Sequence, residues 1–297
     1  MDCKSKKNNI TLNFQIKFSM LKLIADAGST KIEWVVLENR KVVKRLITRG
    51  FNPNYAKIID FINILYKELP KDFPAVDAVH YYGSGCGNEA ARAEMHQILK
   101  VRFEEATEVV VTHDLMGACH ALLGHEKGIA CILGTGANSC VYDGEKITDR
   151  AVSLGYMVGD EGSGCYIGRK LVRAYFYDLM PLELKLEFEK VYQLNIKDFI
   201  DRVYHQPEAS KYLAGFTEFA GEHQSHPFIQ QLVKSCFKEF IDAFVLRYPD
   251  CRNQRVCFVG SVAFYFQYLL HECLSAEGLT MGKVMRSPME GLIQLYS

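Results

Sequence analysis

The stretch KLIADAGSTKIEWVVL, Lys22 to Leu37, places an acidic residue, a glycine and two hydroxyl side chains between two apolar runs. The apolar runs predict two strands, and DAGST predicts the turn that joins them. This turn is longer and richer in hydroxyls than a hairpin requires, because Asn-Gly or Asp-Gly suffices there. A phosphate-binding turn explains the composition: Gly28 lets backbone N–H groups approach an anion, Ser29 and Thr30 add donors, and Asp26 can hold Mg²⁺ directly or through water.

The pattern returns in GIACILGTGANSCVYDGEKIT, which begins at Gly128 and predicts strand, glycine turn, strand, Asp-Gly turn and strand. Aligning Gly28 with Gly136 superimposes the two glycine turns, and each is followed by a hairpin, so we interpret the chain as a duplicated domain. The second turn surrounds Thr135 with Gly134 and Gly136. Two such turns would hold a polyphosphate from opposite sides. Neither turn matches the P-loop or the dinucleotide-binding fingerprint, which disfavours both of those folds.

The remaining periodicity predicts an α/β fold with an antiparallel meander at its start. Strands are expected at 22–27, 32–37, 41–48, 76–82 and 108–112, and helices at 54–68, 88–101 and 115–123. We expect a first domain at 20–118 and a second at 119–297. No low-complexity linker separates them, so the boundary near 115–128 is expected to be a packed hinge.

Composition favours a small-molecule partner. The 297 residues are 48% hydrophobic and carry equal numbers of basic and acidic side chains, which argues against binding to nucleic acid or to a membrane surface. The ten cysteines include no C-x-x-C pair. They are typical of reduced thiols and predict a cytoplasmic protein.

The segment 1–19 is basic and polar, and its apolar residues are interrupted by polar ones. It is therefore not predicted to be a signal peptide, and no other segment is long enough to span a bilayer. We expect either a loosely ordered tail or an upstream start codon, with Met20 as the natural start.

The sequence EVVVTHDLMGACHAL ends a strand at Thr112, His113 and Asp114, where a helix begins. Ligands meet α/β sheets at the carboxyl ends of strands, so Asp114 is a candidate catalytic base for phosphoryl transfer to an alcohol. The alternative is that Asp114 caps its helix. We interpret His113 as structural.

A fourth signal is SLGYMVGDEGSGCYIGRKLVRAYFY, which begins at Ser153. Its helical periodicity is interrupted in the first turns by three glycines, each of which costs about 1 kcal/mol relative to alanine. We therefore expect some group to approach that backbone closely. Asp160 and Glu161 either cap the helix or bind polar ligand groups such as sugar hydroxyls.

The motifs DAGST, THD, LGTGANS, GDEGS, LAGF and FVGSVA occur in this order between Met20 and Ser297. In order and approximate spacing the chain resembles the N-acetylglucosamine kinases of the BadF/BadG-type ATPases, within the actin-like ATPase and sugar kinase superfamily. GDEGS following GTG is the most specific element of this resemblance.

The resemblance implies two ribonuclease H-like domains with a cleft that closes on ATP-Mg²⁺ and an amino sugar, with the C-terminal segment packing back on the first domain. It implies Asp114 as base, Asp26 as metal ligand, and transfer to the 6-hydroxyl of N-acetylglucosamine. A homodimer is favoured by the resemblance alone. The implied ATP-binding residues are Asp26, Gly28, Ser29, Thr30, Gly134, Thr135, Gly136, Ala214, Gly215, Gly260 and Ser261, of which the last four are implied to bind the adenosine part. The implied sugar-binding residues are Asn52, Ser84, Ala137, Asn138, Gly155 and Asp160.

Two departures from the family leave the sugar open. GFNPNY at Gly50 lacks the tryptophan of animal relatives, and SLGY at Ser153 replaces a Gly-Trp-Gly pattern. N-acetylglucosamine, glucosamine, N-acetylmannosamine and N-acetylmuramic acid are all candidates.

Two other functions stay open. One is an ATPase that activates a CoA-ester dehydratase or reductase, for which Cys86 and Cys119 are available as cluster ligands but lie in no cluster motif. The other is a non-catalytic sugar-binding regulator, for which 1–19 is too short to form a DNA-binding helix-turn-helix.

Overall fold

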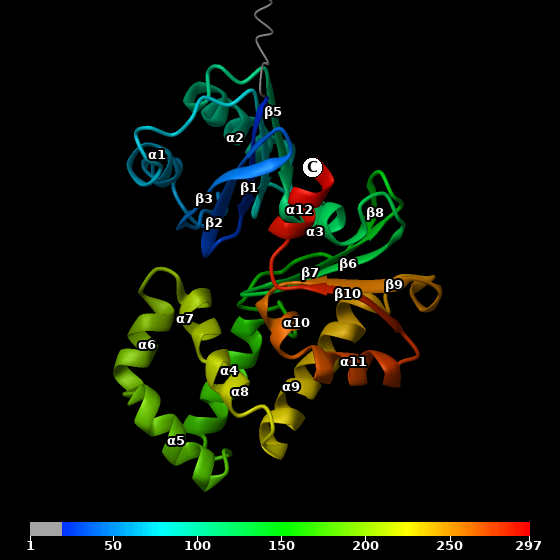
Figure 1. Ribbon diagram of the computed structural model, residues 1–297. Helices are drawn as coiled ribbons and strands as arrows, with labels where there is room; N and C mark the ends of the chain where they lie inside the picture. The colour runs from blue at the N-terminus through cyan, green and yellow to red at the C-terminus, as the bar shows by residue number, and fades with distance from the viewer. Residues whose placement is uncertain (1–19) are drawn as a thin grey trace, which may run out of the picture.

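The structure is a computed structural model that describes residues 20–297; the tail expected at 1–19 lies outside this range. It contains two five-stranded sheets, one above the other in Figure 1, each with helices on its outer side. Within residues 20–297, no helix combines the length and apolar character needed to cross a membrane.

The first sheet has the order β3-β2-β1-β4-β5. Its strands are β1 (Leu21–Ala27), β2 (Lys31–Glu38), β3 (Lys41–Arg49), β4 (Ala78–Gly83) and β5 (Glu108–His113). The first three pair antiparallel, whereas β4 and β5 run parallel to β1. Its helices are α1 (Ile58–Asn63), which continues as the wider turn η1 (Ile64–Glu68), and α2 (Glu89–Arg102).

The second sheet repeats this topology with the order β10-β9-β6-β7-β8. Its strands are β6 (Gly128–Leu133), β7 (Ala137–Tyr142), β8 (Ile147–Arg150), β9 (Arg255–Val259) and β10 (Thr280–Met285). Again three strands form an antiparallel meander, and the last two run parallel to the first. The glycine turns occupy equivalent places, since each joins the first two strands of its sheet, and this supports the duplication.

Most helices of the second half pack on the far side of its sheet (Figure 1). They are α4 (Gly164–Phe176), α5 (Leu182–Tyr192), α6 (Ile196–Tyr204), α7 (Ala209–Gly215), α8 (Thr217–Glu222), α9 (Pro227–Phe240), η2 (Ile241–Val245), α10 (Ser261–Tyr265) and α11 (Gln267–Ala276), with a short turn η3 (Cys251–Asn253) before β9. Phe237 and Phe240 on α9 and Phe258 on β9 are fully buried in this core.

Two helices lie between the sheets. α3 (Asp114–Leu123) contacts strands of both sheets, and α12 (Met289–Tyr296) packs against α3 and β1. Met289 and Leu292 of α12 are buried against Ile24 and Val35 of the first sheet. The end of the chain, red in Figure 1, thus covers the first sheet.

The predicted strands are confirmed within two residues, and the largest difference is at a helix start. The helix expected at 54–68 begins at Ile58 because the carbonyl of Asn52 accepts the N–H groups of Tyr55 and Ala56, which forms a separate turn. The helix after GDEGS begins at Gly164, and Ser163 is its N-cap with its hydroxyl accepting from Tyr166.

The glycines of that helix are explained by protein contacts. A Cβ on Gly168 would lie 1.9 Å from the carbonyl oxygen of Leu213, so α4 and α7 touch backbone to backbone. The group that approaches this backbone is therefore another helix.

Candidate functional site

The two glycine turns meet in the structure. The Thr30 hydroxyl at the β1–β2 turn lies 3.2 Å from the Thr135 hydroxyl at the β6–β7 turn. The first turn is anchored because Gly28 donates its N–H to Lys31 and accepts at its carbonyl from Phe51. Since the Gly28 N–H is used within the protein, the hydroxyls of Ser29 and Thr30 are the side-chain donors available to an anion here.

Asp26 precedes the last residue of β1, and its half-buried carboxyl lies beside two other acids. Burial, followed by repulsion from Glu33 and Asp114, raises the pKa of Asp26 from 3.8 to about 7, against a lowering by Lys31. A carboxyl in this position gains from a nearby cation, because a positive charge relieves the repulsion.

The second turn is held by the start of α4. The carbonyl of Gly134 accepts from the N–H of Gly164 at 2.8 Å, and the carbonyl of Thr135 accepts from Cys165 at 3.1 Å. The first N–H groups of the helix are thus satisfied by the turn. This fixes the turn against the GDEGS segment.

The predicted adenosine-binding residues gather at the same place. A Cβ on Gly164 would contact Ala214 and Val262, both at 3.4 Å. Gly260 has a φ of +131°, and a Cβ there would lie 2.1 Å from the carbonyl oxygen of Leu133, just before the second turn. Only glycine fits such a position. Ala214–Gly215 and Gly260–Ser261 therefore lie next to the second turn, although they are distant from it in sequence.

Asp114 is the first residue of α3, and His113 is the N-cap residue. The Asp114 carboxyl accepts from the Ser84 hydroxyl at 3.0 Å and from the Leu115 N–H at 2.9 Å. Burial raises the pKa of Asp114, although both hydrogen bonds oppose this shift. The carboxyl is thus oriented by Ser84, whose own N–H donates to Ala27 at the end of β1.

Asn52 links its loop to the first turn, because its amide donates to the Ser29 hydroxyl at 3.0 Å. From the same loop, Tyr55 reaches the segment after β8: a Cβ on Gly155 would lie 3.1 Å from the Tyr55 hydroxyl. Gly155 itself has a φ of +73°. The two segments that differ from the family pattern therefore touch.

The interpretation that Asp160 caps α4 is wrong, because Ser163 is the N-cap of this helix. Its side chain is 8% exposed and accepts from the Ala137 N–H at 3.3 Å, at the start of β7. Burial raises the pKa of Asp160, with the bond from Ala137 and the charge of Arg169 opposing it. Asn138 adjoins this contact, and its side chain accepts from Ser139.

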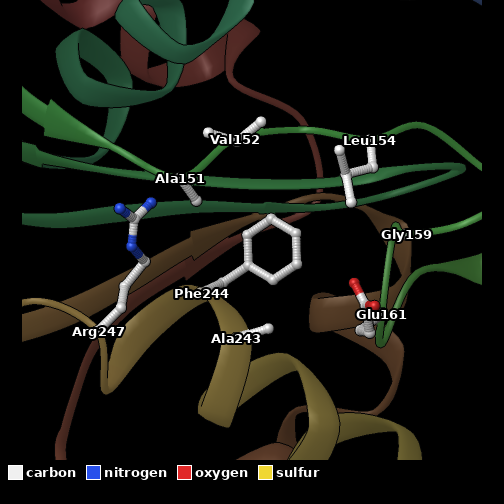
Figure 2. A pocket seen from close by; sticks show the side chains of 8 residues that line it. All are labelled: Ala151, Val152, Leu154, Gly159, Glu161, Ala243, Phe244 and Arg247. Atoms are coloured by element: carbon white, nitrogen blue, oxygen red, sulfur yellow. The ribbon is translucent and has the colours of Figure 1, made fainter.

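Glu161 faces elsewhere. It lines a pocket of about 250 Å³ between the segment after β8 and η2 with the residues that follow it. Figure 2 shows its carboxylate pointing toward this pocket, with Phe244 at the centre and Arg247 on the opposite side. The pocket is lined by Ala151, Val152, Leu154, Gly159, Glu161, Ala243, Phe244 and Arg247, and Glu161 is the one member of this set that the sequence offered as a ligand-binding candidate.

Three arginines near the site gave no signal in the sequence. Arg169 of α4 donates to the carbonyls of Tyr156 and Met157, both at 2.9 Å, and so holds the segment that contains Gly155. Arg92 and Arg150 approach the loop after Ser84. No motif marks these residues. Arg92 and Arg169 contact loops of their own halves, and only the packing of the two halves brings Arg150 to Gly87.

Comparison with known proteins supports this assignment of the fold. No protein-family model matches the chain, and no curated protein matches it either. Among solved structures, a protein from Porphyromonas gingivalis named as a candidate N-acetylglucosamine kinase is 37% identical, with a TM-score of 0.87 over 92% of this chain and 98% of the relative. A candidate N-acetylglucosamine kinase from Chromobacterium violaceum is 14% identical, with a TM-score of 0.72 over 94% of this chain and 99% of that one.

The same architecture occurs in a ROK family glucokinase from Streptomyces griseus, whose structure was solved with glucose and AMPPNP. It is 15% identical, with a TM-score of 0.55 over 93% of this chain and 97% of the glucokinase, which shows the shared fold alone. The first relative is similar enough in sequence, over nearly the whole of both chains, to show the family as well as the fold. The chain therefore belongs to the N-acetylglucosamine kinase-like proteins of the BadF/BadG-type ATPase family, within the actin-like ATPase and sugar kinase superfamily.

Proposed function

We propose that the protein is an ATP-dependent kinase that phosphorylates an amino sugar, N-acetylglucosamine or a derivative of it, at the 6-hydroxyl. The observation that carries the proposal is the Asp114 carboxyl, held by Ser84 near two glycine turns that meet at Thr30 and Thr135. A carboxyl close to a phosphate-binding region is what phosphoryl transfer to an alcohol requires. The names of the two relatives support the sugar.

In the proposed step the 6-hydroxyl oxygen attacks the γ-phosphorus. The new O–P bond forms as the bond to the β,γ-bridging oxygen breaks, and ADP leaves with that electron pair. Asp114 accepts the hydroxyl proton. The raised pKa of its carboxyl suits this role, since a base works best when its pKa approaches the working pH.

Mg²⁺ is the metal that this chemistry implies, and the donor set fits it. Within residues 20–297 no cluster of three or more His, Cys, Asp or Glu side chains could hold a metal by itself. Asp26, whose pKa is raised to about 7 partly by Glu33 and Asp114, is the carboxyl that would hold the ion together with phosphate oxygens. When bound, Mg²⁺ neutralises phosphate charge during transfer.

The sugar would lie against Asp160, Asn138, Asn52 and Ser84. These residues come from both halves of the chain, so a bound sugar would join them. Such closure excludes water, and predicts slow ATP hydrolysis without sugar.

The test is the substitution Asp114→Asn. Asparagine keeps the size of the side chain but cannot accept the proton, so we expect phosphate transfer to fall at least about a hundredfold, the low end of a general base contribution. Sugar-dependent ADP release measures the rate, and ³¹P NMR of the product identifies the phosphorylated hydroxyl. ATP binding by calorimetry and the melting temperature should change little.

Near-normal transfer by Asp114→Asn, together with fast sugar-independent hydrolysis by the wild type, would favour the ATPase activator instead. In the structure Cys86 and Cys119 are fully buried, which does not suit thiols that bridge a cluster between subunits. Sugar binding without any transfer would favour the regulator.

A further inference from the structure

Two arginines from opposite halves of the chain reach one loop beside the proposed acceptor site. Arg92 of α2 donates to the carbonyl of Cys86 at 3.1 Å. A guanidinium nitrogen of Arg150, the last residue of β8, lies 3.6 Å from the position of a Cβ on Gly87. Cys86 and Gly87 are adjacent and follow closely after Ser84, whose hydroxyl orients Asp114.

Within residues 20–297 neither Arg92 nor Arg150 forms an ion pair with a carboxylate. Arg92 is half-buried and Arg150 is exposed, so both can meet a ligand.

The neighbouring histidine reports the same positive field. Burial, followed by the charges of Arg150 and Arg92, lowers the pKa of His113 to about 4. His113 immediately precedes Asp114, so this field lies beside the proposed base. An anion is the ligand that this field favours.

We propose that Arg92 and Arg150 bind an anionic substituent of the acceptor, so that the preferred substrate is an amino sugar that carries a carboxylate, such as N-acetylmuramic acid. This inference rests on the proposed kinase function. Arginine suits the role because its planar donors match a carboxylate. A carboxylate between them would also offset the repulsion of two like charges and join the two halves.

The position of the pair favours the sugar over ATP. The arginines approach the loop that follows Ser84, whereas the residues assigned to adenosine gather around Gly164 at the start of α4. Binding of nucleotide phosphates by the arginines is the alternative that the experiment must separate.

The experiment compares kcat/KM for N-acetylmuramic acid and N-acetylglucosamine in the wild type, Arg92→Gln and Arg150→Gln. We expect the wild type to prefer the acidic sugar. Each glutamine variant should lower the ratio of the two kcat/KM values about tenfold or more, as expected for loss of a charge-assisted hydrogen bond. Arg150→Lys should fall between, because lysine keeps the charge but loses the planar fork.

Arg252→Gln is the matched control. It removes an exposed arginine from η3, ahead of β9 and outside the proposed site, and should leave the ratio unchanged. Raising the salt concentration should increase the wild-type KM for N-acetylmuramic acid more than that for N-acetylglucosamine.

The outcomes separate this inference from the kinase assignment. Phosphorylation of N-acetylglucosamine but not of N-acetylmuramic acid, or equal losses for both sugars in the variants, would overturn the inference and leave the kinase intact. A raised KM for ATP with an unchanged sugar ratio would assign the arginines to the nucleotide and also overturn it. Transfer to no sugar at all would overturn both.

Discussion

At the residue scale, the structure separates two roles that the sequence left open for Asp160. Ser163 caps α4, whereas the Asp160 carboxyl is bound to the N–H of Ala137. Asp160→Asn keeps an oxygen for that bond and tolerates the positive φ of +57°. We therefore expect stability to be nearly unchanged, while kcat/KM for the sugar falls about tenfold or more through loss of a charged acceptor.

Ser163→Ala is the comparison for this prediction. It removes the true cap and should cost about 1 kcal/mol in the free energy of unfolding. Urea unfolding and sugar kinetics on both variants decide the assignment. A large loss of stability in Asp160→Asn with normal kinetics would return Asp160 to a purely structural role.

At the scale of elements, the contact between α4 and α7 depends on Gly168. A methyl group there would lie 1.9 Å from the carbonyl oxygen and 2.9 Å from the carbonyl carbon of Leu213, both backbone atoms that cannot rotate away. Gly168→Ala must separate the helices, so we expect a loss of about 3 kcal/mol, the upper end for overpacking. Because Ala214 follows Leu213 and lies beside Gly164, the KM for ATP should also rise.

Gly221→Ala in α8 is the control, since a Cβ there meets no atom within 4 Å. It should be neutral or stabilise by up to about 1 kcal/mol, because alanine is the better helix former. Melting temperatures and the KM for ATP provide both readouts. If the two variants had equal melting temperatures and equal KM values for ATP, the predicted effect of Gly168→Ala would be wrong.

At the scale of the whole molecule, a cluster of polar side chains links β4, α12 and α3. This cluster predicts that the folded state loses stability at acidic pH. His80 packs against the ring of Tyr296 at 4.4 Å, and the Tyr82 hydroxyl bonds to Tyr296 at 2.6 Å and to His120 at 2.9 Å. Burial lowers the pKa of His80 from 6.5 to about 4, helped by Lys22 and His120 and opposed by Glu108. The folded state thus disfavours protonation of His80.

The stability that neutral His80 contributes is complete above pH 6.5 and is lost as the pH falls toward 4. Between pH 7 and pH 5 the loss is up to about 2 kcal/mol for this one histidine. His80→Gln should reduce the difference in unfolding free energy between these pH values. His96→Gln, on the exposed side of α2, should not, and equal pH dependence in His80→Gln and the wild type would contradict the assignment.

The sequence alone determined the strands, the two glycine turns and the duplication, because apolar periodicity and turn chemistry are properties of short segments. It also identified most of the candidate site, since motifs mark the turns, Asp114 and GDEGS. Its errors lie at the helix starts after Asn52 and Asp160, where side chains and carbonyls form local turns ahead of the helix.

Only the tertiary structure decided which of these parts touch. It brought Thr30 to Thr135, joined Asp160 to Ala137, and showed that the neighbour of Gly168 is the carbonyl of Leu213. It also placed Arg92 and Arg150 at one loop, although neither stands in a motif. The physical reason is that these contacts follow from how two sheets and their helices pack together, and packing joins residues far apart in the chain that no local pattern relates.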